Sequence, residues 1–352
     1  MPDFNEIFSK RLRSAREMKN LSMAALSNLL GGSVSPQAIY KYEAGKMLPG
    51  SGLLAELSRV LEVPVDFFFR PFNVSISGIE FRKKSKLRVG ERRSIEGASI
   101  DRVERYVEIE DISGLKHDNQ MLKFPVKDED DVLEAVRDLR ESWGLGQDNI
   151  VNVIKLLEDH GVIVIEFEAS RDFDGLSGRA NDIPVIVLNK NFPSAERRRF
   201  TALHELGHLV MDIDEQTDDR HVESLCNLFA CEMLLPREAF KKEVGDIYHR
   251  QISLSEFAEV QRKYGISIDA LMYKAKETQM IPESKYRGYF ILKSSRPAFK
   301  NYAEDSRIVD EHSERFDTLV FEALSRDLIS VSKASSLLDM PVDDVLHKSL
   351  VM

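Results

Sequence analysis

Five consecutive residues, His204-Glu205-Leu206-Gly207-His208, carry the most information in this 352-residue chain. In an α-helix, side chains at positions i and i+4 lie on one face, so both imidazoles can reach one divalent metal ion. The carboxylate between them can then act on a water molecule at that ion. No proline interrupts residues 201–214, and apolar neighbours predict a buried helix, namely Ala202, Leu203, Leu206, Leu209 and Val210. Unpaired polar groups are costly in such surroundings, and a metal ion would account for them.

A catalytic zinc ion takes three protein ligands and leaves one coordination position for water. The third ligand is expected on a second helix, predicted over residues 223–235 and ended by Pro236. Three side chains in or beside that helix are candidates: His221, Glu223 and Glu232. The residue types and their spacing do not choose among them.

Residues on both sides of the two histidines extend the pattern. They are Arg199-Phe200-Thr201-Ala202-Leu203 before them, and Glu223-x-x-Cys226-Asn227-x-Phe229-Ala230 and Leu234-Leu235-Pro236 after them. This pattern resembles the ImmA/IrrE family of zinc-dependent metallopeptidases, over about residues 78 to 290. In that family the acid three residues before the small-residue-Asn pair is the third ligand, which here is Glu223. The family usually has alanine where this chain has Cys226.

The resemblance implies that His204, His208 and Glu223 bind Zn²⁺ and that Glu205 is the catalytic residue. Zinc would polarise a water molecule and the scissile carbonyl, and Glu205 would move a proton from that water to the leaving amine. The alternative interpretation is an inactive zinc fold that serves as a binding scaffold, because a fold does not determine a function.

The amino end predicts a separate module of short helices. Ser22 is an expected N-cap of one helix, and after Gly31-Gly32, Ser35 caps another that has Pro36 at its first position. A helix, a glycine turn and a second capped helix form a helix-turn-helix. The string from Ser35 to Lys46, with Pro49, resembles the phage-repressor-like (XRE) DNA-binding family, over about residues 5 to 70.

In the XRE family the second helix of the pair enters the major groove of operator DNA. Carried over, the expected DNA-binding residues are Ser35, Pro36, Gln37, Ala38 and Lys41. Gln37 could bond adenine bidentately, and Lys41 could reach guanine or a phosphate. Arg16 and Glu43 match positions that often pair across the module, whereas Met23 stands where the family often has a phosphate-binding glutamine. The alternative is that this module now binds a protein.

The formal charge of −10 does not exclude DNA binding, because binding depends on where positive charge is gathered. A basic block follows the first module: Arg82, Lys83, Lys84, Lys86, Arg88, Arg92 and Arg93. Additional phosphate contacts and a solvated linker face are both open interpretations of this block.

Cysteine usage and hydropathy predict a cytoplasmic protein without a membrane partner. Cys226 and Cys231 lie on one predicted helix, so no disulfide framework is expected. No apolar run reaches the length of a membrane span, and the start Met1-Pro2-Asp3-Phe4 does not read as a signal peptide.

The expected fold class is mainly α with a small β-sheet (α+β). A helix is predicted over residues 97–110, and strands over 162–167 and 183–189 with a loop from 170 to 182 between them. The expected domains are a five-helix helix-turn-helix domain at 1–72, a basic helical connector at 73–130, a zincin-like metallopeptidase domain at 131–290 and a helical region at 291–352. His312 and His347 are isolated and are left out of the metal site.

Together the two resemblances imply a DNA-binding transcriptional regulator fused to a zinc-dependent endopeptidase that cleaves a repressor or other regulatory protein. The alternative is an antitoxin that represses its own operon and uses the peptidase fold to hold a toxin. A third possibility is a sensor whose cleft binds a small signal molecule. A homodimer is expected because such DNA-binding modules often read paired half-sites.

Overall fold

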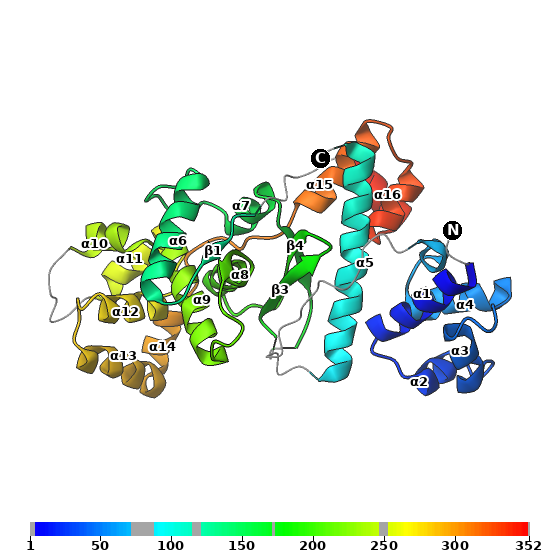
Figure 1. Cartoon of the computed structure of the whole chain (residues 1–352), viewed down its shortest axis with the longest axis horizontal. Helices are drawn as coiled ribbons and strands as arrows, with labels where there is room; N and C mark the ends of the chain where they lie inside the picture. Colours follow the sequence, from blue (N-terminus) through cyan, green and yellow to red (C-terminus); the bar gives the residue numbers. More distant parts are fainter. Residues whose placement is uncertain (1–3, 72–87, 115–120, 171–172, 246–252, 351–352) are drawn as a thin grey trace. The chain divides into compact units, whose positions relative to one another are not determined.

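The computed structural model of the chain describes residues 4–71, 88–114, 121–170, 173–245 and 253–350. These residues form two units, each with its own packing (Figure 1). The first unit is discontinuous and combines residues 4–71, 88–114 and 314–350, whereas the second lies within residues 121–313. Most elements are helices and the sheets are small, which confirms the expected α+β class.

The amino-terminal part of the first unit contains five short helices. They are α1 (Phe4–Met18), α2 (Met23–Leu29), α3 (Pro36–Glu43), α4 (Ser51–Leu61) and the 3₁₀-helix η1 (Val65–Phe69). Ser22 and Ser35 cap α2 and α3 by accepting backbone N–H bonds, as predicted. Gly31 and Gly32 take φ values of 66° and 71° between these helices, a region that favours glycine. The core is apolar and includes Phe8, Leu12, Leu26, Ile39, Leu57, Leu61 and Phe67.

A long helix and three carboxyl-terminal helices complete the first unit. They are α5 (Val89–Ser113), α15 (Arg315–Ser325), α16 (Val331–Leu338) and α17 (Val342–Ser349). Helix α5 extends beyond the predicted 97–110 at both ends. The buried Arg11 of α1 donates to Glu104 of α5 at 2.6 Å, and Tyr106 of α5 packs on Phe316 of α15. Of the basic block, Arg82, Lys83, Lys84 and Lys86 lie outside the described residues.

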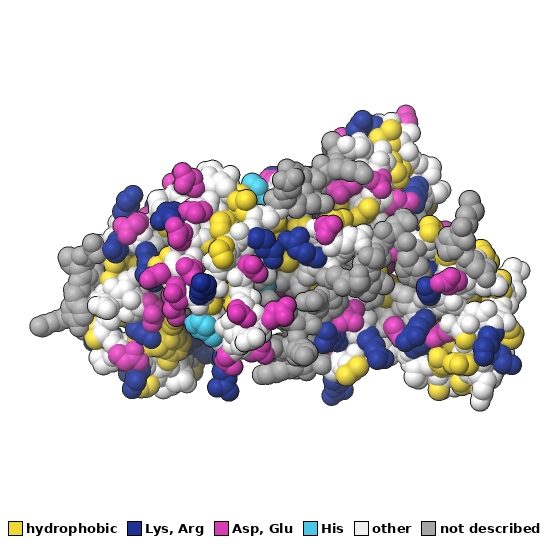
Figure 2. Space-filling view, in the orientation of Figure 1, with side chains coloured by type: hydrophobic (Ala, Val, Ile, Leu, Met, Phe, Trp, Pro, Cys, Tyr) yellow, Lys and Arg dark blue, Asp and Glu magenta, His cyan; other side chains and the backbone are white. Residues whose placement is uncertain are grey.

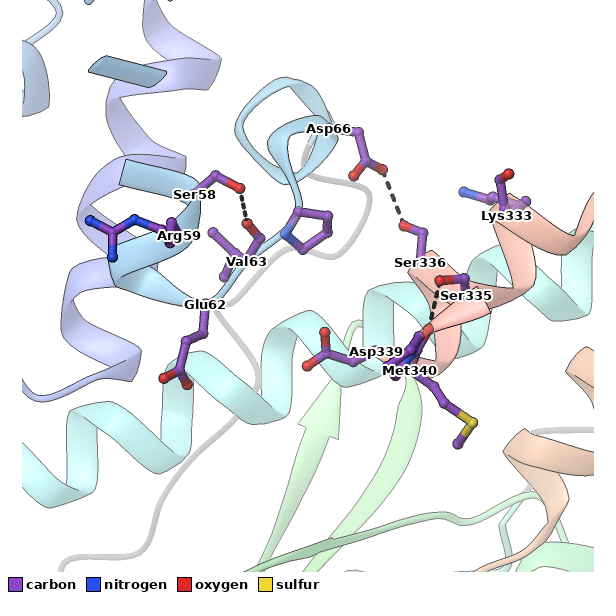
Figure 3. A pocket seen from close by; sticks show the side chains of 13 residues that line it. Ser58, Arg59, Glu62, Val63, Asp66, Lys333, Ser335, Ser336, Asp339 and Met340 are labelled. Carbon is purple, nitrogen blue, oxygen red and sulfur yellow. Dashed lines mark hydrogen bonds between the residues drawn. The ribbon is translucent and has the colours of Figure 1, made fainter. Parts of the chain in front are cut away.

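Two turns of the first unit have the same construction (Figure 3). Helix α4 ends at Glu62 and helix α16 at Asp339, with left-handed φ values of 52° and 54°. A proline follows two residues later in each case, and a serine in the preceding helix closes the turn. Ser58 Oγ donates to the Val63 carbonyl at 2.6 Å, and Ser335 Oγ donates to the Met340 carbonyl at 2.6 Å. The two turns line one pocket of about 720 Å³.

The second unit packs helices around a three-stranded sheet. Its strands are β2 (Ile163–Phe167), β3 (Gly175–Ala180) and β4 (Ile183–Asn189), in the order β2-β4-β3. Strand β2 is parallel to β4, and β3 is antiparallel to it. A further short parallel pair joins β1 (Phe124–Pro125) to β5 (Met211–Asp212). The helices are α6 (Glu129–Ser142), α7 (Val153–Asp159), α8 (Ala195–Val210), α9 (Asp219–Leu234), α10 (Arg237–Val244), α11 (Leu254–Tyr264), α12 (Ile268–Glu277), α13 (Glu283–Ser295) and α14 (Pro297–Glu304).

Strand β3 corrects the prediction of a plain loop over residues 170–182. Its sequence, Gly175-Leu176-Ser177-Gly178-Arg179-Ala180, has two glycines and no β-branched residue, so it carries little intrinsic strand signal. The backbone pairing with β4 decides its conformation. This strand lies next to α8, the helix that carries the two histidines.

Helices α8 and α9 pack against each other through a buried apolar interface. Leu203 and Leu206 of α8 and Leu225 and Phe229 of α9 belong to one core cluster. Gly207 allows a close approach, because a β-carbon at that position would lie 3.1 Å from the Phe229 ring. The interface brings the start of α9 to the face of α8 that carries His204 and His208. Among the described helices, none is long and apolar enough to cross a membrane.

Candidate metal centre

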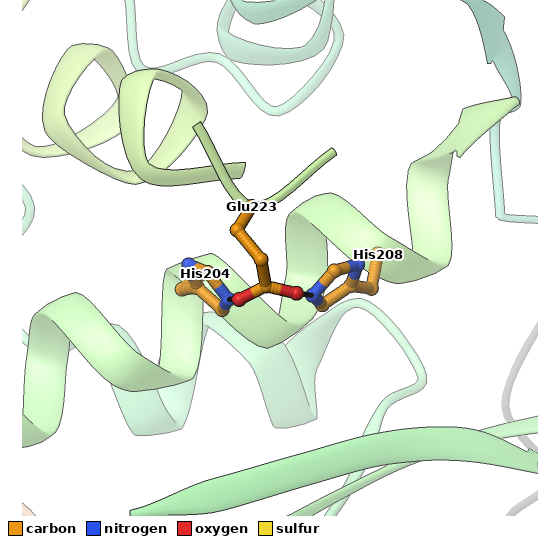
Figure 4. Close-up of side chains that lie close together, drawn as sticks. All are labelled: His204, His208 and Glu223. Carbon is orange, nitrogen blue, oxygen red and sulfur yellow. Dashed lines mark ion pairs between the residues drawn. The ribbon is translucent and has the colours of Figure 1, made fainter. Parts of the chain in front are cut away.

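The structure brings together His204, His208 and Glu223, the three ligands that the family resemblance implies (Figure 4). His204 Nε2 lies 3.5 Å from one carboxylate oxygen of Glu223, and His208 Nε2 lies 3.6 Å from the other. Two ligands that each bind a zinc ion at about 2.1 Å with tetrahedral angles are about 3.4 Å apart. The two distances end on different carboxylate oxygens, and one ligand atom from each of the three side chains lies within 4.8 Å of the others, which is close enough to hold one ion.

Two consecutive residues of α9, Cys226 and Asn227, contact the Nδ1 atoms of the imidazole rings, on the side away from Glu223. Asn227 Oδ1 lies 3.0 Å from His204 Nδ1, and Cys226 Sγ lies 3.2 Å from His208 Nδ1. A partner at Nδ1 fixes the ring orientation and leaves Nε2 as the ligand atom. Both Nε2 atoms accordingly face Glu223. Cys226, which replaces the alanine usual in the resembling family, thus has a direct contact with a candidate ligand.

The side chain of Glu205, which lies between the two histidines in the sequence, is held by a hydrogen bond from the sheet. Ser177 Oγ of β3 donates to Glu205 Oε2 at 2.6 Å, and the Glu205 side chain is buried. Sequence reasoning did not assign Ser177 to the site, because it placed this residue in a loop. The stretch Gly175-Leu176-Ser177 also resembles the ImmA/IrrE family, and this resemblance is the sequence signal that could assign Ser177 to the site.

The charge around His204 favours its protonated form when no ion is bound. Burial of the imidazole lowers the pKa of His204, but the hydrogen bond with Glu223 and the negative charges of Glu205 and Glu223 raise it. The net result is a pKa above the usual histidine value. The same negative charge would favour a cation in this place.

The other candidates for the third ligand lie elsewhere. Glu232 accepts a hydrogen bond from Lys274 Nζ at 2.5 Å and another from the Arg237 backbone at 3.0 Å, so its carboxylate is used within the core. His221 is not part of the His/Glu cluster, which in the described part of the chain is the one group of such residues close enough together to hold a metal ion. Geometry therefore separates the three candidates that the sequence left open.

The expected DNA-binding residues all lie on or beside α3. Gln37 and Lys41 are exposed, whereas Pro36 and Ala38 are half-buried. Ser35 accepts a hydrogen bond from the Ala38 backbone N–H and so caps the helix. The expected pair is present, since Arg16 Nε donates to Glu43 Oε1 at 2.6 Å.

Comparisons with known proteins agree with both resemblances. Residues 157–276 match the family model of the IrrE N-terminal-like domain, and residues 12–68 match a helix-turn-helix family model. The chain thus combines an IrrE-like domain with an XRE-type helix-turn-helix domain. The IrrE-like match includes the whole His/Glu cluster, and it indicates a metallopeptidase fold.

Two curated relatives match a short part of the chain. They are the uncharacterized HTH-type transcriptional regulators y4aM and y4wC of Sinorhizobium fredii, which are 40% and 37% identical to it over 60 residues. Each match covers 17% of this chain and 41% of the relative, so the chain spans about two fifths of the length of these relatives.

Proposed function

We propose that the chain is a DNA-binding transcriptional regulator whose IrrE-like domain is a zinc-dependent endopeptidase that cleaves a repressor or other regulatory protein. The observation that carries the enzymatic part is the convergence of His204, His208 and Glu223, which places one ligand atom from each side chain within 4.8 Å of the others. His204, His208 and Glu223 are the proposed ligands, and Glu205 is the proposed catalytic residue.

The proposed chemistry depends on proton transfer by Glu205. When bound, zinc would polarise a water molecule and the scissile carbonyl. Glu205 accepts the proton of the attacking water and delivers it to the leaving nitrogen. The bond from Ser177 holds the carboxylate at the side of the two histidines, so Ser177 is a positioning residue. The buried setting strengthens these electrostatic interactions.

Strand β3 offers a place for an extended substrate. In the described residues its strand partner is β4, on one side only, and it is therefore an edge of the sheet. An extended peptide can add to such an edge through main-chain hydrogen bonds. Because Ser177 of β3 binds Glu205, a peptide along this edge would pass close to the catalytic carboxylate. The contact between the edge strand and Glu205 supports a protein substrate.

The DNA-binding part of the proposal rests on α3. Gln37 and Lys41 are exposed on a capped helix that follows the glycine turn, the arrangement in which a helix-turn-helix presents its second helix to the major groove. Exchange of both residues for alanine is expected to weaken binding to a preferred DNA site and leave metal content unchanged. Electrophoretic mobility shifts with a site selected from random-sequence DNA would measure this, and an unchanged affinity would contradict the assignment.

Metal analysis and two variants test the peptidase. The purified chain should hold about one zinc ion, His208→Ala should lose it, and Glu205→Gln should keep it while losing cleavage. Cleavage is measured as new protein amino termini formed in a host lysate by the wild type and by Glu205→Gln. A wild type without metal, or equal cleavage by Glu205→Gln, would refute the proposal. A partner that both forms retain uncleaved would instead indicate the toxin-holding scaffold.

A further inference from the structure

The first turns of α5 lie against the turn that leads into α2. A β-carbon at Gly90 would lie 2.1 Å from Asn20 Oδ1, and one at Gly97 would lie 2.9 Å from Met18 Cγ. Between them, Ser94 Oγ donates a hydrogen bond to the Met18 carbonyl. Glycine at two positions of α5 therefore allows a close contact with residues 18–20, directly before the Ser22 cap of α2.

This end of α5 carries exposed positive charge. Arg88, at the N-cap position, and Arg93 are both exposed, and the side chain of neither forms an ion pair or hydrogen bond with another described residue. Arg92 pairs with Glu96 at 2.8 Å, and the first turn of α5 contains the acid Glu91. Figure 2 shows Lys and Arg side chains gathered around this end of α5 and the adjoining end of the helix-turn-helix domain. Arg88 and Arg93 are thus available to a partner.

The geometry of a helix-turn-helix places the same region beside DNA. When the second helix of the pair lies in the major groove, the first helix crosses the sugar-phosphate backbone. Here the first helix is α2, and it begins with Met23, which is partly buried against the domain core. A methionine side chain has no hydrogen-bond donor, so it cannot bind a phosphate. Arginine supplies several donors in a planar fork that suits phosphate oxygens.

We infer that Arg88 and Arg93 bind phosphates of the DNA backbone beside the start of α2, so that the DNA-binding surface extends from the helix-turn-helix domain onto α5. This inference rests on the proposed DNA-binding function and adds a second contact surface to it. It also accounts for DNA binding by a chain of formal charge −10, because the positive charge is concentrated where the backbone passes. Phosphate contacts add affinity without reading sequence.

The test compares the full chain with its Arg88→Ala/Arg93→Ala variant on two probes, a duplex selected from random-sequence DNA and an unselected duplex. Each lost phosphate contact lowers the slope of log affinity against log salt by about 0.9, so the variant should lose about 2 units of slope. Its affinity for both probes should fall by the same factor at low salt. The Arg88→Lys/Arg93→Lys variant keeps both charges and should keep most of the slope.

A matched control removes two exposed arginines of the second unit, Arg137 and Arg287, and should leave the slope unchanged. An unchanged slope in Arg88→Ala/Arg93→Ala, in a chain that still binds DNA through Gln37 and Lys41, would overturn the inference alone. Failure of the wild type to bind either probe would overturn the proposed DNA-binding function itself. Zinc content and thermal unfolding should stay as in the wild type, because both side chains are exposed.

Discussion

At the scale of single residues, the raised pKa of His204 determines how metal binding should respond to pH. An imidazole must be neutral at Nε2 to bind a metal ion. Because the pKa of His204 lies above the usual value, protonation competes with the ion at a higher pH than an ordinary histidine would allow. In the metal-free chain the effect of pH on stability has the opposite sign. Protonated His204 stabilises the fold below the pKa of a histidine in the unfolded chain. This contribution is lost as pH rises through the pKa of His204 in the folded chain.

We therefore expect zinc affinity to fall steeply as pH decreases from about 8 to about 5.5. Competition with a chelating dye at a series of pH values would measure this. A zinc affinity that does not change over the range would show that His204 is not a ligand. His312→Ala, which removes an exposed histidine far along the chain, is the control and should follow the wild-type curve.

Ser177 gives a prediction about Glu205, the proposed catalytic residue. Ser177→Ala removes the hydrogen bond to Glu205 Oε2, so the carboxylate should lose its fixed orientation while the three ligands stay in place. Loss of such an outer partner typically lowers activity by about 10- to 100-fold. Cleavage rate and zinc content should be measured together, with Ser177→Thr as the variant that keeps a hydroxyl. Equal loss in the threonine and alanine variants would argue against an orienting role.

The residues of the site differ in how well the sequence could predict them. His204, Glu205 and His208 follow from helical geometry alone, because histidines four positions apart lie on one helix face. Glu223 needed the family resemblance, since its approach depends on how α9 packs against α8. The contacts of Ser177 and Cys226 depend on the same long-range packing and on the paired strand β3. No local pattern encodes them.

At the scale of secondary-structure elements, the turn after α11 supports the helix that bears the histidines. Gly265 ends α11 with a φ of 63°, and a β-carbon there would lie 2.7 Å from Arg199 Cζ. Arg199 belongs to α8 and donates from one guanidinium nitrogen to Glu311 Oε1 at 2.9 Å and from another to the Ile150 carbonyl. Gly265 therefore leaves room for the buried Arg199, whose hydrogen bonds connect α8 to the segments that contain Ile150 and Glu311.

Gly265→Ala should destabilise the second unit through two effects. The left-handed backbone costs an alanine about 1–2 kcal/mol, and displacement of the Arg199 guanidinium adds to that. Gly144→Ala is the matched control, because Gly144 has a φ of 67° and no neighbour within 4 Å of an added β-carbon. Denaturant unfolding followed by circular dichroism would compare the two. Equal losses of stability in both variants would mean that the contact with Arg199 contributes nothing.

Helices with capping residues and regular apolar spacing could be predicted from the sequence. Strand β3, which depends on pairing with another strand, could not. Capping residues and apolar spacing predicted α2, α3 and α8, because these signals lie within each helix. Strand β3 was missed because its glycines and Arg179 give no alternation of apolar and polar residues. Its backbone takes the strand conformation through pairing with β4.

At the scale of the whole molecule, a buried ion pair attaches the helix-turn-helix domain to α5. Arg11 is 1% exposed and Glu104 is 8% exposed, so neither charge is compensated by bulk water. Arg11 also donates to the carbonyls of Arg70 and Pro71, which places the guanidinium where three segments meet. The side chain of Arg11 therefore also holds the backbone at the end of η1.

Arg11→Ala should leave Glu104 buried without its cation and cost about 3–5 kcal/mol in the unfolding of the first unit. Replacement of both residues, Arg11→Met with Glu104→Leu, should recover much of that loss because both charges of the buried pair are removed together. Chemical unfolding resolved into the transitions of the two units is the measurement, and the second unit and its metal content should not change. An unaltered first transition in Arg11→Ala would contradict this account of the attachment.

The discontinuous first unit has a consequence for biosynthesis. Phe316 of α15 covers Tyr106 of α5, and Lys333 of α16 pairs with Glu108 of the same helix. A nascent chain that has left the ribosome as far as α5 lacks both partners until roughly 200 further residues are made, about 10–40 s at about 5–20 residues per second. During that interval α5 lacks its contacts with α15 and α16. Helix α5 is thus made early in the chain and completes its packing only after the last helices are made.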